Sequence, residues 1–593
     1  MFKRSLHRLL HCLLVPIREN AVFFLFMLML GEECIVFEPW NSLRHLSLFE
    51  LVLELYVFCL LLTLLPLRLR RAVRLVSAIV AYAVSLLDCT LYVCTGAPLT
   101  SPMLRAILAT TGGEASEALH AYLSPMMLFS PVGLILLLAM AHVGFCLYGK
   151  WQRIMLPYIY KILQWILPVM LPLGLCLSLT NERYLFHRLV LAQSDTQLPQ
   201  SLMDANIRTG YYLPVYRLWI SLIEIGRDGR AVRTLPHTAA QATVDSCTFT
   251  SPHIVFILGE SYNRHHASLY GYPLPTTPIT QRLKEEGELY LFTDMVTPWN
   301  FTTEAIEQLL STACIGDSLR WFQAPLITTL MRSAGYHVQF LSNQYVLHPR
   351  KNLHSLIDAQ LLANEELSRM QFSLRNAEIH PYDEALLQDY DSLHGFQTDH
   401  NFIIFHLHGQ HVEFADRIPP SRRYFRPSNY HRPDLNARQL QILSDYDNAM
   451  RYGDSVVSQI LSRFQNEEAI VLFLSDHGER AFDGSPHYGR SNGFEPSDIR
   501  QQYEIPFWIW VSPSYAARHA ALCHGIGHAT TLPYSSDRLP HLIMHLAGLH
   551  TPAYQPSADP LHPNYDARRP RMLRGRLDYD HWQREQHSQG LAH

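Results

Sequence analysis

The sequence carries almost no net charge. Its 593 residues hold 48 lysines and arginines against 52 aspartates and glutamates, which gives a formal net charge of -4 at pH 7. This balance gives no indication of a nucleic-acid partner, because such proteins carry a basic excess that meets the phosphate backbone. No internal repeat or low-complexity tract is evident, so the fold has to be derived from hydrophobic patterning.

Cysteine is scarce in the second half of the chain. Seven of the ten cysteines lie before residue 181, and only Cys247, Cys314 and Cys523 follow. Three thiols form at most one internal disulfide, which excludes a dense disulfide framework in this half. The seven earlier cysteines are expected to pack as small apolar side chains.

Long hydrophobic runs, by contrast, dominate the first 180 residues. Five blocks are long and apolar enough to cross a bilayer, at about residues 21–37, 46–67, 72–93, 126–148 and 154–179. The first block is followed by four others, so it is not a cleaved signal peptide. Residues 1–180 are therefore predicted to form an α-helical membrane domain of five transmembrane helices.

Basic residues between the blocks predict the orientation of this domain. They lie before the first block, between the second and third, and between the fourth and fifth: Lys3, Arg4, Arg8, Arg18, Arg68, Arg70, Arg71, Arg74, Lys150 and Arg153. Such segments face the cytoplasm. Five crossings then place everything after the fifth block on the opposite side, which in a bacterium is the periplasm.

Several acidic residues lie in or beside the hydrophobic blocks. They are Glu32, Glu33, Glu50, Glu54 and Asp88. Charges at membrane depth face a cavity or the interior of a helix bundle, and the alternative for each is a place at the membrane interface.

The second half changes to a mixed, globular pattern. Residues 181–246 are predicted to be a juxtamembrane linker, with a helix around 207–219 and a loop over 233–246. From 247 to 593, short apolar runs alternate with longer amphipathic stretches, which is typical of an α/β domain with a largely parallel sheet. The expected strands are 253–258, 289–296, 337–341, 402–407, 470–474 and 506–511, and the tail after about residue 551 is polar and proline-rich.

Ionisable side chains follow three of these strands. Glu260 follows "HIVFILG", His411 follows "FIIFHLHGQ", and Asp476 and His477 follow "IVLFLS". In parallel sheets ligands bind beyond the carboxyl ends of the strands. Glutamate, aspartate and histidine are zinc ligands, and three of them with one exchangeable position form a catalytic zinc arrangement. A solvated turn is the alternative interpretation of "SDHGE".

Thr302 and Thr303 stand at the start of a predicted helix, in "FTTEA" after the strand at 289–296. A threonine at this position is commonly an N-cap, and Glu304 behind it fits a helix start without any chemistry. A nearby metal would instead activate the hydroxyl as a nucleophile, and a helix N-terminus stabilises a bound phosphate. Capping and catalysis are compatible, so both interpretations stay open.

Four motifs together resemble those of the phosphoethanolamine transferases of Gram-negative inner membranes. They are "ILGESYNRHHASLYGYPLPTTP" at 257–278, "SDYDNAMRYGD" at 444–454, "LSDHGE" at 474–479 and "EIPFWIWVS" at 504–512. This family includes lipid A modifying enzymes and relatives that act on the lipopolysaccharide core. The resemblance covers nearly the whole chain and implies five spans followed by a periplasmic α/β domain of the alkaline phosphatase and sulfatase type.

The resemblance also implies a zinc site. Its four ligands would be Glu260, Thr302, Asp476 and His477, with the threonine as nucleophile as well. Thr302 is preferred to Thr303 because Glu304 and Ala305 follow it at the spacing of the family pattern.

Further site residues are implied more loosely. His411 and His487 resemble family histidines that contact the phosphate or protonate the leaving group, although the two residues after His411 depart from the family sequence. A satisfied surface histidine is the alternative for both. Glu479 resembles a carboxylate that supports the ligands or an accessory metal, and Asn343 and Gln344 match a segment that faces the phosphate in relatives.

One loop in the first half carries a polar motif. "ATTGGEASEA" at 109–118 resembles the family's Thr-Asn-x-x-Glu-Ala motif, with Thr111 in place of asparagine. Thr110 and Glu114 are expected to hold the head group of the donor lipid at the membrane face. A plain interfacial turn is the alternative.

The function implied is transfer of phosphoethanolamine from phosphatidylethanolamine to lipopolysaccharide, at a core sugar or lipid A, through a zinc-activated threonine and a covalent intermediate. The alternatives are a phosphoglycerol transferase of the lipoteichoic-acid synthase type, which shares the layout, and transfer to a periplasmic glucan. A sulfatase is disfavoured because "CIGDS" at 314–318 lacks the Cys-x-Pro-x-Arg pattern, and a non-catalytic binding module because the ligand set is intact. Within the family that the chain resembles, the colistin-resistance branch carries several disulfides; the few cysteines of the second half contrast with it and favour a core-sugar acceptor, with lipid A and periplasmic glucans left open.

Overall fold

The computed structural model describes residues 12–37, 47–95, 98–109, 125–147, 149–186, 213–240, 242–347, 361–362, 364–393, 395–491 and 493–588. The chain divides into two compact units: Met1–Leu104 with Tyr122–Ile225, and Arg105–Ala121 with Gly226–His593. Each unit is described by itself below.

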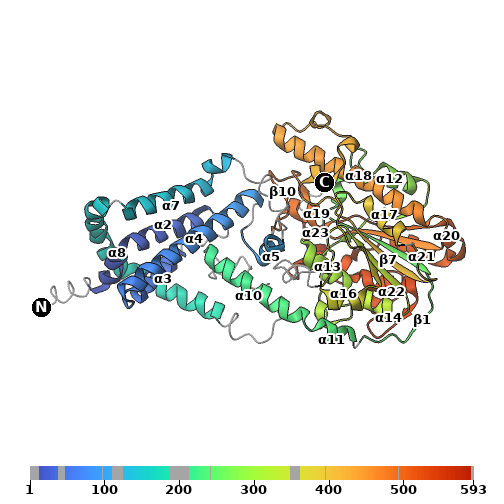
Figure 1. Cartoon of the computed structure of the whole chain (residues 1–593), viewed down its shortest axis with the longest axis horizontal. Coiled ribbons are helices and arrows are strands. Elements are labelled where there is room, and N and C mark those ends of the chain that lie inside the picture. The colour runs from blue at the N-terminus through green and yellow to red at the C-terminus, as the bar shows by residue number, and fades with distance from the viewer. Residues whose placement is uncertain are drawn as a thin grey trace. The chain divides into compact units, whose positions relative to one another are not determined.

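The first unit is built of apolar helices that coincide with the five predicted blocks. They are α2 (Ala21–Phe37), α3 (Ser47–Thr63), α4 (Leu67–Thr95), α7 (Pro131–Leu147) and α8 (Gly149–Phe186) (Figure 1). Within the described residues, Leu67–Thr95 and Leu156–Leu179 are long and apolar enough to cross a membrane, and the bent pair Cys12–Glu19 and Ala21–Ile35 would make a third span. The count of five crossings therefore stays a prediction, because α3 and α7 have 17 residues each.

Two of the acidic residues predicted at membrane depth pair with the helix that follows, α10 (Pro214–Val232). Asp88 of α4 accepts hydrogen bonds from Arg217 Nε at 2.9 Å and Nη2 at 2.5 Å, and both side chains are buried. Tyr216 donates its hydroxyl to Glu54 of α3 at 2.6 Å. Since a buried charge is costly without a partner, these contacts fasten the start of α10 to the helices of this unit.

The expected loop at 233–246 is only partly a loop. Residues Leu235–Ala240 form a short helix, α11, and Ser246–Cys247 form a strand, β1. Leu235 is buried and belongs to the core of the second unit. This tertiary contact explains why the segment forms a helix despite its turn-like composition. The predicted helix at 207–219 is described from Pro214 onward, and the linker boundaries stay a prediction.

The second unit is organised around a seven-stranded sheet. Its order is β3 (Leu289–Phe292), β11 (Phe507–Val511), β8 (Ala469–Ser475), β2 (His253–Gly259), β7 (Asn401–His406), β5 (His337–Ser342) and β6 (Leu374–Arg375). All neighbouring pairs are parallel except those of β11, which is antiparallel to β8 and β3. The predicted largely parallel α/β sheet is confirmed.

One predicted strand divides in two. The expected run at 289–296 forms β3 and a separate strand β4 (Met295–Val296), which pairs with β12 (Tyr534–Ser535) outside the main sheet. Asp294 stands at the break and accepts a hydrogen bond from Arg571 at 2.6 Å. The chain leaves the main sheet at Asp294, and the contact with Arg571 holds it on the course that leads to Thr302.

Both faces of the sheet are buried. In β2, Ile254, Phe256 and Leu258 belong to one core cluster, while Val255 and Ile257 belong to another. This alternation explains the continuous apolar runs, because a strand covered on both faces needs apolar residues at every position. Helices α13 (Thr302–Leu310), α14 (Ile327–Ser333) and α22 (Leu539–Ala547) contribute to the first cluster, and α17 (Ala385–Ser392) and α18 (Ala437–Phe464) to the second (Figure 1).

The polar tail folds back onto the sheet domain. Arg571 is buried between the carboxylates of Asp294 and Asp580, at 2.6 Å from each. Arg574 donates its backbone N–H to Pro298 O at 2.8 Å. The C-terminal segment, including α23 (Tyr579–Ser588), thus braces the loop that leads to Thr302.

His266 ties the loop after β2 to two other segments. Its Nδ1 lies 2.7 Å from Asp447 Oδ1 of α18 and its Nε2 lies 2.8 Å from Asp483 Oδ2. Burial by itself lowers the pKa of a histidine, but the two carboxylates raise the pKa of His266 to about 10. The imidazolium is therefore charged and paired at neutral pH.

This pairing predicts a pH-dependent stability. The contribution of His266 to the free energy of unfolding is full below its unfolded pKa of 6.5 and is lost as the pH rises toward 10. We expect His266→Gln to lower the thermal midpoint of the second unit most at pH 6 and progressively less toward pH 10. The exposed His550→Gln is the control, and a midpoint difference that stays constant over this pH range would refute the assignment.

Candidate active site

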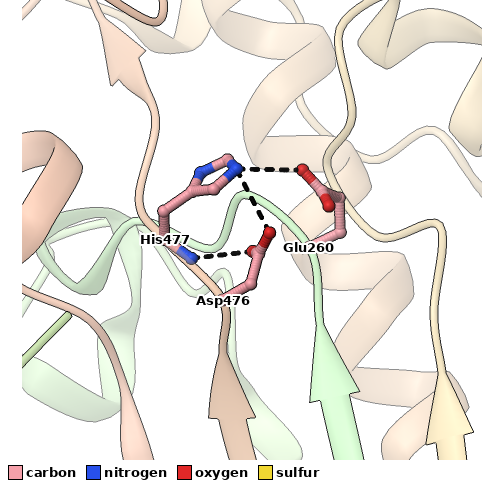
Figure 2. Close-up of side chains that lie close together, drawn as sticks. All are labelled: Glu260, Asp476 and His477. Atoms are coloured by element: carbon pink, nitrogen blue, oxygen red, sulfur yellow. Dashed lines mark hydrogen bonds and ion pairs between the residues drawn. The ribbon is translucent and has the colours of Figure 1, made fainter. Parts of the chain in front are cut away.

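Three ionisable side chains meet at the carboxyl ends of two adjacent parallel strands. Glu260 follows β2, Asp476 and His477 follow β8, and Gly259 and Ser475 are paired in register at the strand ends. This register brings residues separated by more than two hundred positions onto one edge of the sheet, as the sequence predicts. Figure 2 shows the three side chains pointing toward one another.

The three side chains offer ligand atoms to one point. His477 Nε2 lies 3.3 Å from Glu260 Oε1 and 3.2 Å from Asp476 Oδ2, and one ligand atom of each residue lies within 4.8 Å of the others. All three residues are buried, with exposed fractions of 0 to 2%. Within the described residues this is the group of acidic, histidine and cysteine side chains arranged to hold a metal ion.

Thr302 completes the group. Its Oγ1 lies 3.1 Å from Glu260 Oε2 and 3.2 Å from His477 Nε2. Phe301 occupies the N-cap position of α13, so Thr302 is the first residue of the helix and its hydroxyl makes no capping bond there. The hydroxyl points at the ligand atoms, with the N-terminus of α13 beside it.

The electrostatics of the site favour a bound cation. Burial raises the pKa of Asp476, and the nearby Glu260 carboxylate raises it further. Asp476 Oδ2 is buried without a hydrogen-bond partner in the described part of the chain, while Oδ1 accepts the N–H groups of Ser261 and His477. Two buried carboxylates stay ionised together only when positive charge compensates them, so the donor set fits a divalent metal.

The histidine is held in the tautomer that a metal requires. His477 Nδ1 lies 2.8 Å from Gly478 O, and a carbonyl oxygen only accepts hydrogen bonds. Nδ1 therefore carries the proton, and the lone pair of Nε2 faces Glu260, Asp476 and Thr302.

Asn343 and Gln344, which the sequence predicts to face the phosphate, make different contacts. Gln344 Nε2 donates to Glu260 Oε2 at 3.3 Å and to Leu407 O at 2.7 Å, so it orients a ligand carboxylate. Asn343 is fully buried and uses both polar atoms within the protein, donating to Asp383 and accepting the N–H of His380. Both polar atoms of its amide thus hold the wall of the site, and the substrate contact expected for Asn343 stays a prediction.

The other predicted residues lie around this centre. Glu479 is fully buried, and burial raises the pKa of its carboxyl group. His411 lies beside His408, with ring centroids 5.3 Å apart, and acts electrostatically on Glu260. His487 is half-buried, between β9 (Arg480–Ala481) and β10 (Tyr488–Gly489). Thr110 and Glu114 lie outside the described residues.

Sequence reasoning missed Arg490. Its Nη1 donates to Thr302 Oγ1 at 3.0 Å and lies 3.2 Å from His477 Nε2, and its Nε lies 3.7 Å from Glu479 Oε2. The residue follows none of the predicted strands and belongs to none of the four motifs, so only its proximity to the predicted site residue His487 pointed to this segment. It places a permanent positive charge on the candidate nucleophile.

The chain is similar to known proteins over most of its length. The sulfatase family profile matches residues 252–549, just over half of the chain. Phosphoethanolamine transferase EptC of Escherichia coli K12 is 27% identical over 533 residues, which cover 88% of this chain and 87% of that protein. Phosphoethanolamine transferase CptA of Salmonella typhimurium LT2 is 27% identical over 508 residues, covering 84% and 83%.

A solved structure extends the likeness to the first half. The integral membrane protein lipooligosaccharide phosphoethanolamine transferase A (EptA) from Neisseria meningitidis matches with a TM-score of 0.62 at 16% identity, over 91% of this chain and 97% of that one. At this identity the match shows the fold alone. The resemblance to phosphoethanolamine transferases that the motifs predict is confirmed, as is the sulfatase-type α/β fold.

The contact of Gln344 with Glu260 predicts a role in metal affinity. Replacing a group that orients a ligand typically weakens metal binding about 10- to 100-fold, so Gln344→Leu should weaken zinc binding by this amount while the fold persists. Competition with a chromophoric chelator would measure it. The control is Gln441→Leu, whose amide donates to Asp445 and not to a ligand; equal affinities of the two variants would remove Gln344 from the site.

Proposed function

The chain belongs to the sulfatase family, and we propose that it transfers phosphoethanolamine from phosphatidylethanolamine to a lipopolysaccharide acceptor. One observation carries the proposal: Thr302 Oγ1 lies within 3.3 Å of both Glu260 carboxylate oxygens and of His477 Nε2, at the N-terminus of a helix. The alignment with EptC and CptA over most of both chains supports the donor group.

The residues that would hold zinc are Glu260, Asp476, His477 and the hydroxyl of Thr302. Two carboxylates, an imidazole and an alkoxide oxygen are zinc donors, and the metal would lower the pKa of the hydroxyl and neutralise charge on the phosphate. Gln344 orients Glu260, and Gly478 O orients His477. These second contacts keep the ligand atoms directed at one point.

The reaction has two displacement steps at one phosphorus. Thr302 Oγ attacks the phosphorus of the donor and loses its proton, the bond from phosphorus to the diacylglycerol oxygen breaks, and diacylglycerol leaves with a proton. A hydroxyl or phosphate oxygen of the acceptor then attacks the same phosphorus, and the threonine oxygen leaves and regains a proton. His411, which acts electrostatically on Glu260, is our candidate for the proton donor to the leaving group.

The negative charge that develops on the phosphate meets two groups of the protein. Arg490 Nη1 is within hydrogen-bond distance of the attacking oxygen, and its guanidinium presents a planar set of donors that matches a phosphate. α13 begins at Thr302, and a helix N-terminus favours a bound phosphate.

We propose the compartment from the basic segments of the sequence. With these segments in the cytoplasm, the sulfatase-type domain would lie in the periplasm and the helices in the inner membrane. The donor lipid then diffuses to the site within the bilayer, and Thr110 and Glu114 are expected to hold its head group.

The proposed nucleophile can be tested directly. When the full-length, zinc-loaded protein is incubated with phosphatidylethanolamine, intact mass spectrometry and peptide mapping should find a phosphoethanolamine adduct on Thr302. Thr302→Ala should abolish the adduct with zinc content preserved, whereas Thr303→Ala should retain it. An adduct that survives in Thr302→Ala but not in Thr303→Ala would transfer the role to Thr303, and a phosphoglycerol adduct from phosphatidylglycerol would replace the proposed donor.

A second prediction concerns Arg490. Removing one preorganised donor to a developing anion costs about 100-fold in rate or more, so Arg490→Ala should slow adduct formation by that factor with little change in zinc content. Arg490→Lys should recover part of the rate because it keeps the charge but not the planar donor set. The exposed Arg568→Ala is the control; an unchanged rate in Arg490→Ala would exclude the role.

A further inference from the structure

A basic segment lies between His411 and helix α18 along the chain. Residues 417–433 contain five arginines and no acidic residue, although the whole chain has more acidic than basic residues. The segment follows η8 (Phe414–Arg417) and includes the short helices η9 (Pro420–Arg422) and η10 (Pro427–Asn429). No part of the catalytic geometry described above uses its outer side chains.

The backbone of this segment is held rigidly. Asn448 Oδ1 of α18 accepts the N–H groups of Tyr424 and Phe425 at 2.6 and 2.7 Å, and Asn448 Nδ2 donates to Phe425 O at 2.9 Å. Tyr430 donates its hydroxyl to Asp447 at 2.7 Å. Four prolines restrict the remaining backbone. A preordered loop loses little conformational entropy when it binds a partner.

Two of the five arginines serve the fold. Arg417 contacts His408 Nδ1 at 3.2 Å, and Arg432 pairs with Asp434 and Asp483. The other three are exposed: Arg422, Arg423 and Arg426. Arg423 lies 3.7 Å from Asp445, whereas Arg422 and Arg426 have no acidic partner within the described residues.

An aromatic ring stands among the exposed arginines. The Tyr424 side chain is 58% exposed, and the guanidinium of Arg451 from α18 stacks on its ring at 4.0 Å from the centroid. We call Arg422, Arg423, Tyr424, Arg426 and Arg451 the arginine–tyrosine surface. A tyrosine ring held in this way offers a flat apolar face beside several planar cations.

Side-chain contacts connect the segment that carries this surface to residues around the candidate active site. Arg417 connects the start of the segment to His408, whose ring lies 5.3 Å from that of His411. At the other end Tyr430 and His266 share the carboxylate of Asp447, and His266 lies in the loop that begins at Glu260. Both ends of the segment are therefore linked by side-chain contacts to segments that follow the strands of the candidate active site.

We propose that the arginine–tyrosine surface docks the acceptor, and that the acceptor is a phosphorylated saccharide; the inference rests on the proposed transferase function. Guanidinium groups bind phosphate and carboxylate groups in pairs of hydrogen bonds, and an exposed tyrosine ring packs on the face of a sugar ring. The large apolar residues of the segment, Ile418 and Phe425, are buried, so the loop lacks side chains for insertion into a bilayer. This favours a sugar chain over the donor lipid as partner.

The experiment separates the two half-reactions of the full-length, zinc-loaded protein in nanodiscs. The test variant combines Arg422→Ala, Arg423→Ala and Arg426→Ala. The control removes the same charge from exposed sites of the same unit through Arg282→Ala, Arg568→Ala and Arg584→Ala. Adduct formation is followed with phosphatidylethanolamine, and discharge of the adduct with purified lipopolysaccharide before and after enzymatic dephosphorylation.

We expect the test variant to form the adduct at the normal rate but to discharge it about tenfold more slowly at low lipopolysaccharide concentration, because the guanidinium groups that pair with the acceptor phosphates are gone. At saturating acceptor the rate should recover, since docking affects KM and not kcat. Tyr424→Ala should act in the same direction and Tyr424→Phe should not. With dephosphorylated lipopolysaccharide the test and control variants should no longer differ in discharge.

Three outcomes would overturn the inference or separate it from the proposed function. Equal discharge by test and control variants overturns it, and slower adduct formation in the test variant alone assigns the surface to the membrane or the donor instead. If the wild type forms no adduct, the proposed function itself fails. The surface is then judged by fluorescence polarisation with a labelled phosphorylated core oligosaccharide, where equal binding by both variants overturns it.

Discussion

The structure of the second unit depends on the electrostatic repulsion between two buried carboxylates, which positive charge has to compensate. Two parallel strands in register, β2 and β8, are followed directly by Glu260 and Asp476, and both carboxylates are buried beside His477. Without water to solvate them, these groups are tolerated only with positive charge between or beside them. Arg490 supplies positive charge beside the candidate nucleophile. The inward lone pair of the histidine and the two carboxylates form a donor set that suits a divalent metal.

One turn of helix α18 organises the loops around this centre. The Tyr446 hydroxyl accepts the N–H of Asn263 and donates to Ser261 O, which holds the loop after Glu260. Asp447 holds His266 and Tyr430, and Asn448 holds the backbone of Tyr424 and Phe425. The motif "SDYDNAMRYGD" thus contributes no ligand. It explains how a site made of strand ends keeps its geometry and how a rigid basic loop is presented beside it.

The fold of the second unit could be predicted largely from local signals. Six apolar runs bounded by polar residues coincide with strands of the observed domain, because a strand covered on both faces needs apolar residues throughout. The same rule located Glu260, Asp476 and His477, since ionisable residues at the ends of buried strands are costly unless they are used. The five apolar helices of the first unit also follow from length and composition, whereas the number of crossings does not.

The sequence by itself therefore determined the elements and predicted Glu260, Asp476 and His477 as candidate ligands, because hydrophobic period and strand ends are properties of neighbouring residues. The tertiary structure alone decided which hydroxyl faces the ligands, that Arg490 touches it, that Asn343 is part of the wall and that the polar tail braces the nucleophile loop. These facts depend on strand register and on contacts between segments that are distant in sequence, such as Thr302 and Arg490, which are 188 residues apart. Their contacts are made by side chains whose direction no local pattern encodes.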